Sequence, residues 1–284
     1  MTKAFCPGHI SCFFSPVRTD NVMTTGSTGA GIRLNKGVTV TLEERRDGKT
    51  VTIMDGKHAE AKISEAAVTA LAPGRGFDMI IDNELPVSQG FGMSAAGAVA
   101  AGLCAAAASG KEEQNAYEAA HAAEVRNGGG LGDVAGILGG RQPIRVSAGI
   151  PPYGRTVDTG IRTDVTVAVL GVPVDTKKVL SDEKIMKKIT SAGKQCVTEY
   201  LNSQTEKILY DVSARFSYSI GLETKDVTSA LRLLRKDHSA SMCMLGNSIF
   251  TNADEERTRE LLGDGIVIIS CSSGDEGPRL IRKA

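Results

Sequence analysis

Runs of β-branched and apolar residues in the first third of the chain predict strands. Residues 1–6 have strand character, and so do Val38–Leu42 and Thr50–Ile53. Asp47-Gly48 lies between the last two runs, and this dipeptide favours the tight turn of a hairpin. The pattern therefore predicts a strand-rich N-terminal region with a hairpin between residues 38 and 53.

Longer segments with helical character follow this region. Ile63–Leu71 predicts a helix that ends before Pro73-Gly74, and Phe77–Ile81 predicts a further strand. A segment of small, Ala-rich residues predicts a helix that ends near Ser109. Lys111–Asn127 predicts the next helix, because three glycines follow it and glycine commonly ends a helix.

The second half of the chain begins after a break in the pattern at two consecutive prolines. A turn and a strand within residues 139–146 precede that break, so we expect domains 1–150 and 151–284. In the second half, a strand, then helices and then a strand, without a tandem repeat, predict an α+β domain. The expected elements of the second half are strand Val165–Leu170, helices near Asp182–Leu201, Glu206–Ser219, Lys225–Arg235 and Asp254–Leu262, and strand Ile266–Cys271.

The composition is typical of a globular protein that acts on a small molecule. Apolar residues make up 41% of the 284 residues and charged residues 23%. Lys and Arg number 33, as do Asp and Glu, so no basic field indicates nucleic acid or an anionic membrane. The N-terminus lacks a long apolar segment and Ala95–Ala108 is too short to span a bilayer, which predicts a cytoplasmic protein. The six cysteines form no C-x-x-C pair, so we expect buried, reduced thiols.

The segment with the clearest chemistry is the glycine-rich loop Pro86–Gly97, which leads into the Ala-rich helix. Gly90 and Gly92 permit positive φ and close approach of a ligand, and the free N–H groups of a helix start attract anions such as phosphate. A plain turn before a core helix is the alternative. The P-loop pattern fails because Glu43 stands where its first Gly belongs. A dinucleotide fingerprint is weaker, because residues 82–89 separate the preceding strand from Gly90.

Further polar residues lie in patterns that favour a site. Tyr117, His121 and Glu124 share one helix face, although a solvated face would look the same. The glycines of Gly128–Gly136 would allow the backbone to present Asp133 into a cavity, and a surface turn is the alternative. Thr24–Gly31 is either a flexible linker or a loop over a polar substrate, and residues 239–248 are expected in the core.

The glycine-rich loop resembles the phosphate-binding motif of the GHMP small-molecule kinases, P-x-x-x-G-L-G-S-S-A. Pro86, Gly90, Gly92, Ser94 and Ala95 occupy the family positions, with Phe91 in place of Leu and Met93 in place of the first Ser. The resemblance implies the GHMP kinase fold, with an N-terminal ribosomal-S5-like β-α domain and a C-terminal α/β sandwich domain. The family's third motif corresponds to residues 239–248, of which only Gly246 is kept.

Other segments resemble one branch of this family, the archaeal pantoate kinases. This resemblance implies ATP-dependent phosphorylation of the primary hydroxyl of pantoate to 4-phosphopantoate in coenzyme A biosynthesis, with ATP and Mg²⁺ bound, in a possible homodimer. The matching segments are Pro7–Ser11, Gly26–Gly31, Gly90–Ala96, Ala120–Val125, Gly130–Val134 and Met244–Ser248.

The same resemblance implies a role for individual residues. Ser94 and Glu124 would hold Mg²⁺, and Asp133 would accept the proton of the hydroxyl; these three are the expected catalytic residues. His9 is expected to be a structural, hydrogen-bonded histidine. The nucleotide phosphates would contact Gly90, Phe91, Gly92, Met93, Ser94 and Ala95, and pantoate would contact Ser27, His121 and Arg145.

Three other interpretations stay open at this point. Homoserine or mevalonate could replace pantoate, because each carries an alcohol that such a kinase phosphorylates. A nucleotide-binding sensor without catalysis is disfavoured, because both Glu124 and Asp133 are present. A nucleic-acid-binding β-α module would need a basic face, which the balanced charge does not supply.

Overall fold

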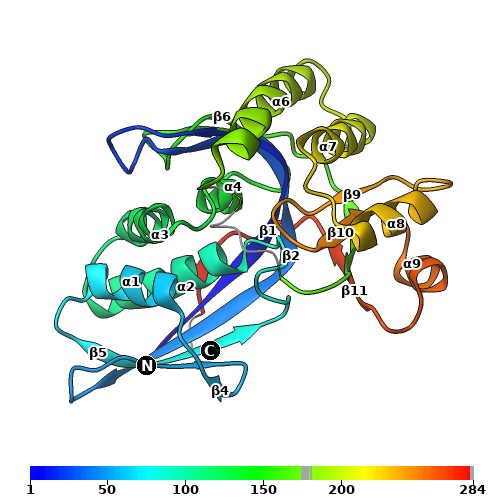
Figure 1. The fold of residues 1–284 in the computed structure, drawn as a ribbon. Coiled ribbons are helices and arrows are strands. Elements are labelled where there is room, and N and C mark those ends of the chain that lie inside the picture. The colour runs from blue at the N-terminus through cyan, green and yellow to red at the C-terminus, as the bar shows by residue number, and fades with distance from the viewer. Residues whose placement is uncertain (174–178, 180, 282–284) are drawn as a thin grey trace.

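In a computed structural model of the protein, residues 1–173, 179 and 181–281 are described, and they form two sheets with helices packed on them (Figure 1). The elements up to residue 158 are β1 (Thr2–Val17), β2 (Gly26–Arg45), β3 (Val51–Met54), β4 (Lys57–His58), α1 (Lys62–Leu71), β5 (Gly76–Asn83), α2 (Met93–Ala108), α3 (Glu113–Asn127), α4 (Asp133–Leu138), β6 (Pro143–Ser147) and β7 (Arg155–Asp158). The later elements are β8 (Asp164–Val169), α6 (Glu183–Asn202), α7 (Glu206–Ile220), α8 (Lys225–Leu234), β9 (Ala240–Met242), β10 (Ser248–Thr251), α9 (Glu255–Leu262), β11 (Val267–Ser272) and β12 (Arg279–Leu280).

The first sheet is organised around one long antiparallel hairpin. β1 and β2 pair from Thr2 opposite Leu42 to Val17 opposite Gly26. The strand order is β12-β1-β2-β5-β3-β4, and β6 and β7 extend the sheet beside the far half of β2. The hairpin runs diagonally through the molecule and carries the chain from the lower helices to α6 (Figure 1). It therefore links the two halves of the structure.

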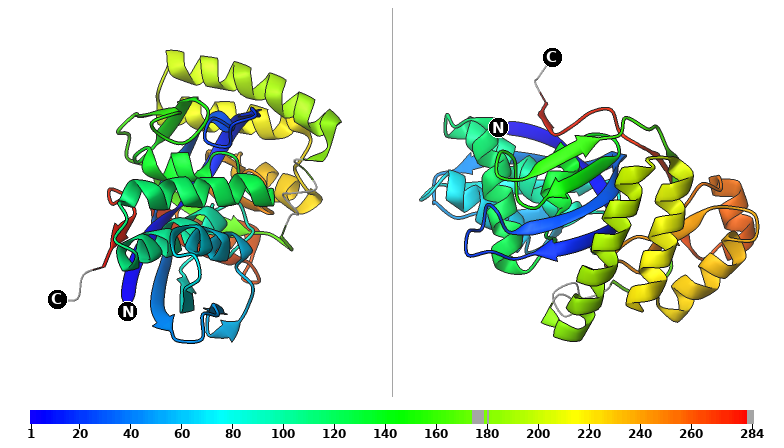
Figure 2. Two further views of the ribbon diagram at one scale, coloured as in Figure 1. Left: turned by 90° about the vertical axis from the view of Figure 1, so that its left-hand side faces the viewer. Right: turned by 90° about the horizontal axis from the view of Figure 1, so that it is seen from above.

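Helices α1, α2 and α3 pack together on one face of this sheet, while α6 and α7 lie at the other end of the hairpin (Figure 2). α2 consists mainly of Ala and Gly and is buried along almost its whole length. Such small residues let neighbouring backbones approach closely: a Cβ at Gly102 would lie 3.1 Å from the Ala116 oxygen of α3. The helix that follows the glycine-rich loop is therefore packed in the core along most of its length.

The second sheet is antiparallel with the order β11-β8-β10-β9. Its helices confirm the sequence prediction, because α6, α7, α8 and α9 begin and end close to the expected residues. The side chains of Asp182, Thr205, Thr224 and Asp254 each accept a hydrogen bond from the first turn of the helix that follows. These caps explain why the sequence located the helix starts well.

Two segments after residue 150 complete the first sheet. β7 pairs with β6, and β12 returns near the end of the described chain to pair with β1. The division into domains 1–150 and 151–284 stays a prediction.

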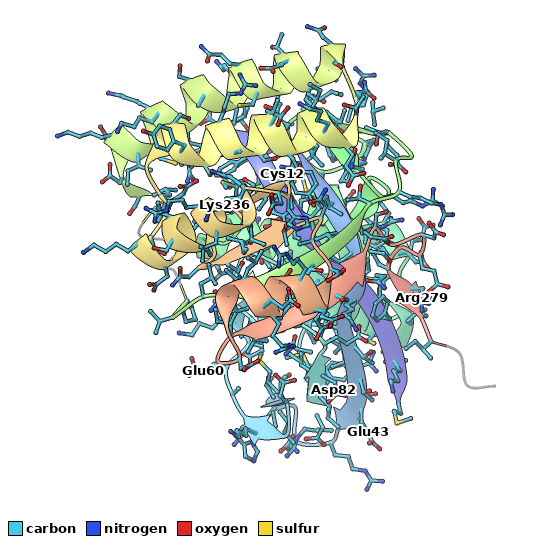
Figure 3. The ribbon with its side chains drawn as sticks, turned by 90° about the vertical axis from the view of Figure 1, so that its right-hand side faces the viewer. Cys12, Glu43, Glu60, Asp82, Lys236 and Arg279 are labelled. Carbon is cyan, nitrogen blue, oxygen red and sulfur yellow. The ribbon has the colours of Figure 1, made fainter. Side chains whose placement is uncertain are left out.

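All six cysteines are free and buried, as expected, and Cys12 lies in the interior beneath the helices of the second half (Figure 3). Among the described residues, no helix combines the length and apolar character that crossing a membrane requires.

The predicted hairpin between residues 38 and 53 is wrong. β5 lies between β2 and β3: it pairs antiparallel with β2 and parallel with β3. Helix α1 lies in the crossover from β3 to β5 that a parallel strand pair requires, and it buries Ala67, Val68 and Leu71. The Asp47-Gly48 turn exists, but it joins strands that are not neighbours.

The glycine-rich segment Thr24–Gly31 is mostly strand, because β2 begins at Gly26. The glycines are needed for close packing: a Cβ at Gly31 would collide with the His9 ring, and one at Gly29 would collide with the backbone oxygen of Phe13. Glycine inside a strand often marks such an approach. The sequence allowed a flexible linker or a loop over a polar substrate at Thr24–Gly31. The structure has neither there, because most of this segment is a strand that packs tightly on β1.

Candidate active site

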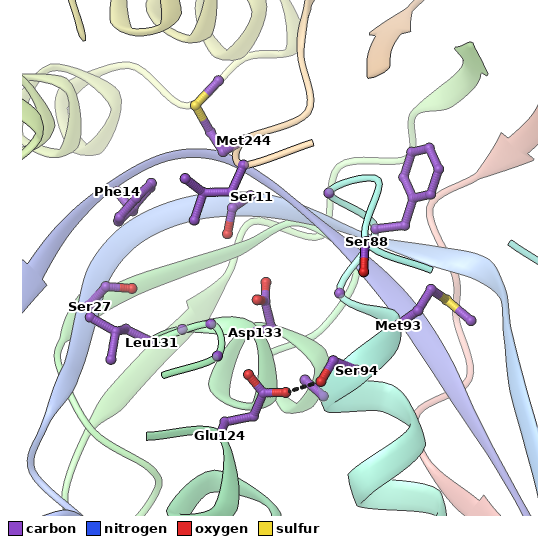
Figure 4. A pocket seen from close by; sticks show the side chains of 18 residues that line it. Ser11, Phe14, Ser27, Ser88, Met93, Ser94, Glu124, Leu131, Asp133 and Met244 are labelled. Carbon is purple, nitrogen blue, oxygen red and sulfur yellow. Dashed lines mark hydrogen bonds between the residues drawn. The ribbon is translucent and has the colours of Figure 1, made fainter. Parts of the chain in front are cut away.

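A cavity of about 320 Å³ opens where the glycine-rich loop, the long hairpin and the loop before α4 meet. Figure 4 shows Asp133 near its middle, with Ser94 and Glu124 on one side and Ser27 and Leu131 on the other. The residues that line it are Ser11, Phe14, Ser27, Ser88, Gly90, Phe91, Gly92, Met93, Ser94, Ala95, Glu124, Gly129, Gly130, Leu131, Gly132, Asp133, Met244 and Leu245.

The glycine-rich loop has the backbone geometry of an anion site. Gly90 and Gly92 have φ values of 81° and 63°, in the left-handed region that favours glycine, and Gly92 is the residue before α2. The backbone N–H of His9 donates to the Phe91 oxygen at 2.9 Å and fixes the loop to β1. The free N–H groups and the dipole at the start of α2 thus face the cavity.

The turn at Met244–Ser248 supports this loop from behind. Ser248 Oγ donates to the Gln89 oxygen at 2.5 Å, and the Asn247 N–H donates to Gln89 Oε1 at 3.2 Å. A Cβ at Gly246 would collide with the Gln89 carbonyl. The segment is almost wholly buried, as expected for the core, and it also fixes the position of the loop.

Gly246→Ala is expected to weaken the binding of an anion such as pyrophosphate at the loop at least tenfold, because overpacking against the Gln89 backbone displaces the loop. Titration calorimetry and a thermal melt would measure the change in affinity and in stability. Gly265→Ala is the matched control, since nothing lies within 4 Å of a Cβ there. An unchanged affinity in Gly246→Ala would contradict the supporting role of the turn.

Glu124 is a buried carboxylate that pairs with the hydroxyl of Ser94, an exposed residue. Ser94 Oγ donates to Glu124 Oε1 at 2.6 Å (Figure 4), and Glu124 is only 1% exposed. Burial raises the pKa of Glu124 to about 7; the charge of Asp133 adds to this, and the Ser94 hydrogen bond opposes it. A divalent cation would offset the cost of this buried charge, and both groups are the hard oxygen ligands that Mg²⁺ prefers.

Asp133 begins α4 and is held by a histidine from β1. His9 Nδ1 lies 2.9 Å from Asp133 Oδ1, and Arg145 Nη1 lies 3.4 Å from His9 Nε2. Burial lowers the pKa of His9, and the neighbouring Arg145 charge adds to the effect, so the imidazole is neutral at pH 7. Its Nδ1–H then donates to Asp133, while Nε2 faces the guanidinium.

The pKa of Asp133 lies below its ordinary value. Burial alone would raise it, but the hydrogen bond from His9 and the positive charge of Arg145 outweigh burial. Asp133 is therefore ionised at neutral pH. Oδ1 accepts from His9 Nδ1, and Ser11 is a further hydrogen-bonding neighbour of the carboxylate.

Arg145 lies fully buried behind the cavity wall. Its Nη2 donates to Ser11 Oγ at 3.4 Å, and its Nε has no hydrogen-bond partner. A Cβ at Gly132 would lie 2.7 Å from Nε and would collide with Ser27 Oγ. Gly132 therefore lets the guanidinium and the Ser27 hydroxyl approach the same part of the wall.

The structure brings together most of the predicted site residues. Ser27, Glu124, Asp133 and residues 90–95 all line the cavity, whereas His121 and Arg145 do not. His121 Nε2 bonds instead to the Val22 oxygen at 3.0 Å, in the turn between β1 and β2.

Sequence reasoning missed the contact between His9 and Asp133, and the cavity positions of Ser11, Phe14 and Leu131. One signal was available for His9, because two glycines, Gly31 and Gly136, leave room for its ring. The sequence alone does not show that either glycine packs against the His9 ring, because only the fold brings these residues together.

A glycine-rich loop with the geometry of an anion site, a carboxylate–hydroxyl pair and an ionised Asp within one cavity are the parts that phosphoryl transfer requires. A family model described as the GHMP kinases N-terminal domain matches residues 59–141, which include the loop, Glu124 and Asp133. Fold and site therefore define a GHMP kinase, and the α+β GHMP kinase fold predicted from the sequence is confirmed.

Similar proteins of known function indicate which branch of the GHMP kinases this chain belongs to. A pantoate kinase from Thermococcus kodakarensis is 32% identical, covering 93% of this chain and 92% of the relative. A pantoate kinase from Methanospirillum hungatei is 33% identical, over 87% and 86% of the two chains. A solved structure described as a phosphotransferase related to the CoA biosynthesis pathway superposes with a TM-score of 0.89 at 28% identity, covering 99% of this chain and 98% of the other. The chain belongs to the pantoate kinase family.

Proposed function

We propose that this protein transfers the γ-phosphoryl group of ATP to the primary hydroxyl of pantoate, giving 4-phosphopantoate for coenzyme A biosynthesis. The observation that carries the proposal is the position of Asp133, between the phosphate loop and the Ser27 end of one cavity. Membership of the pantoate kinase family supports the choice of substrate.

The loop residues 90–95 would bind the phosphates of ATP through their backbone N–H groups. Ser94 Oγ and the carboxylate of Glu124 would hold Mg²⁺, which neutralises charge on the phosphates when it is bound. Their hydrogen bond of 2.6 Å places both oxygens side by side before a cation arrives. Glu124 must lose its proton to bind the cation, and its raised pKa means that this occurs near pH 7.

Asp133 would orient the primary hydroxyl of pantoate through its carboxylate and accept its proton as the bond to phosphorus forms. Its lowered pKa keeps it ionised in the resting enzyme. His9 would fix the direction of the carboxylate through Oδ1, and it acts on the reaction only through Asp133. Much of the catalysis in such an enzyme is positioning, which rigid hydrogen bonds of this kind supply.

Ser27 would contact the far end of pantoate, where the substrate carries its carboxylate. Arg145 would supply the positive charge for that carboxylate, and its unpaired Nε supports this role because a buried donor without a partner is costly. The predicted contact of His121 with pantoate stays part of the proposal. The hydrogen bond between His121 and the Val22 oxygen would also fix the turn before β2, the strand that carries Ser27.

The family resemblance also supports a cytoplasmic homodimer with domains 1–150 and 151–284. Light scattering on the purified chain would measure its mass in solution, for comparison with 29.8 kDa for one copy. Twice that mass is the result expected for a dimer, and the mass of a single copy would rule it out.

The test of the proposed function is ADP release with ATP and Mg²⁺ in the presence of D-pantoate, pantothenate, homoserine or mevalonate. We expect turnover with pantoate that exceeds turnover with each other alcohol by at least 100-fold, since a site matched to one polar substrate rejects others strongly. Turnover with homoserine or mevalonate instead would keep the kinase and reject pantoate. ATP binding without turnover of any alcohol would favour the nucleotide-binding sensor.

A further inference from the structure

The two ends of the cavity differ in chemistry. Figure 4 shows Ser94 and Met93 on the side of the phosphate loop, Asp133 in the middle, and Phe14, Ser27 and Leu131 at the opposite end. The loop end offers N–H groups and oxygens to phosphates. The opposite end combines one hydroxyl with two large apolar side chains, which a polyphosphate does not need.

The apolar side chains at that end are rigid parts of the cavity wall. Phe14 is 5% exposed and packs edge-to-face on Phe216 of α7, with 5.9 Å between the ring centroids. Its backbone also touches α6, where a Cβ at Gly193 would collide with the Phe14 oxygen. Leu131 is 6% exposed, and a Cβ at Gly26 would lie 3.1 Å from its oxygen. Both residues line an open cavity that they do not fill.

The order of groups along the cavity can be compared with the order of groups along a substrate. Asp133 takes the hydroxyl that is phosphorylated, and Ser27 with Arg145 lies at the end assigned to the carboxylate. A four-carbon hydroxy acid that spans these points places its third carbon between them, next to the apolar wall. In pantoate this carbon carries two methyl groups and no hydrogen.

We propose that Phe14 and Leu131 form a recognition site for the two methyl groups on the third carbon of the substrate. The inference rests on the proposed function and goes further, because it names the residues that select a dimethyl-substituted hydroxy acid over an unbranched one. Burial of methyl groups against a preformed apolar wall favours the branched substrate. Ser27 does not supply this selection, since both kinds of acid carry the carboxylate.

The test compares D-pantoate with 2,4-dihydroxybutanoate, which has the same hydroxyls and carboxylate but lacks both methyl groups. We expect kcat/KM of the wild-type enzyme to be roughly 100-fold higher for pantoate, the range that apolar pockets achieve for small alkyl groups. In Leu131→Ala, kcat/KM for pantoate should fall about tenfold while that for the unbranched acid changes little. The preference would then shrink to about tenfold.

Three controls separate recognition from folding. The KM for ATP should stay unchanged in Leu131→Ala, which shows that the phosphate loop is intact. Leu131→Met, which keeps the apolar volume, should retain most of the preference. Leu233→Ala removes a leucine of α8 that is 36% exposed and does not line the cavity, and it should leave both rates unchanged.

The inference is overturned if the wild-type enzyme uses both acids equally well, or if Leu131→Ala lowers both rates by the same factor. In either case phosphorylation of pantoate by the wild type would leave the proposed function standing. Absence of any turnover of pantoate would overturn the proposed function, and the methyl recognition site with it.

Discussion

Asp133→Asn is expected to lower kcat for pantoate by about 10³-fold, because an amide cannot accept the proton of the hydroxyl. The substitution keeps the size of the side chain, and its amide oxygen can still accept from His9 Nδ1. The KM for ATP should change by less than about threefold, since loop residues 90–95 do not depend on Asp133. Single-turnover kinetics would separate the loss of chemistry from any loss of binding.

The control for this experiment is Asp82→Asn, which alters an exposed carboxylate of β5 outside the cavity. It should leave kcat unchanged. An Asp133→Asn enzyme that keeps more than about a tenth of the wild-type kcat would contradict a proton-accepting role. Residue 133 would then assist phosphoryl transfer by positioning the hydroxyl, without accepting its proton.

Glu124→Gln is expected to move activity and stability in opposite directions. Loss of the carboxylate should lower kcat/KM by about 10²-fold or more, because the neutral amide holds Mg²⁺ poorly. In buffer with EDTA at pH 8, the same variant should melt about 5 °C above the wild type, since it no longer buries an unpaired charge. Catalytic carboxylates often carry such a cost in stability.

The pH dependence of that difference follows from the raised pKa of Glu124, about 7 in the folded protein against an ordinary 4.5. The folded state binds this proton more tightly than the unfolded state, so stability falls as pH rises from about 4.5 to 7. The melting difference between the variant and the wild type should therefore shrink as pH falls to 5. Thermal melts with and without Mg²⁺ would show it, and a variant less stable than the wild type at pH 8 would contradict the assignment.

The sequence predicted those parts of the site that lie in short segments. Gly90, Gly92 and Ser94 belong to one loop, and the position of Glu124 follows from a helix with a clear glycine stop. Glycines on both sides of Asp133 indicated its exposure to a cavity. In each case the signal comes from a few neighbouring residues, so it needs no knowledge of the fold.

The contacts that the sequence could not predict join distant segments. His9 and Asp133 are 124 residues apart, and Arg145 follows His9 by 136 residues. The insertion of β5 between β2 and β3 is a further example, because a local turn signal cannot exclude a third strand. The strand from Gly26 was missed for a related reason, since its glycines serve close packing against residues that only the fold brings near.

The most direct test of the central claim is phosphorus NMR of the product formed from D-pantoate, ATP and Mg²⁺. The account predicts one new phosphomonoester signal that is coupled to the two protons on C4 of pantoate, together with an equal amount of ADP. Phosphate on the C2 hydroxyl would contradict the placement of the primary hydroxyl at Asp133. ADP with free inorganic phosphate, and no ester, would contradict transfer to pantoate altogether.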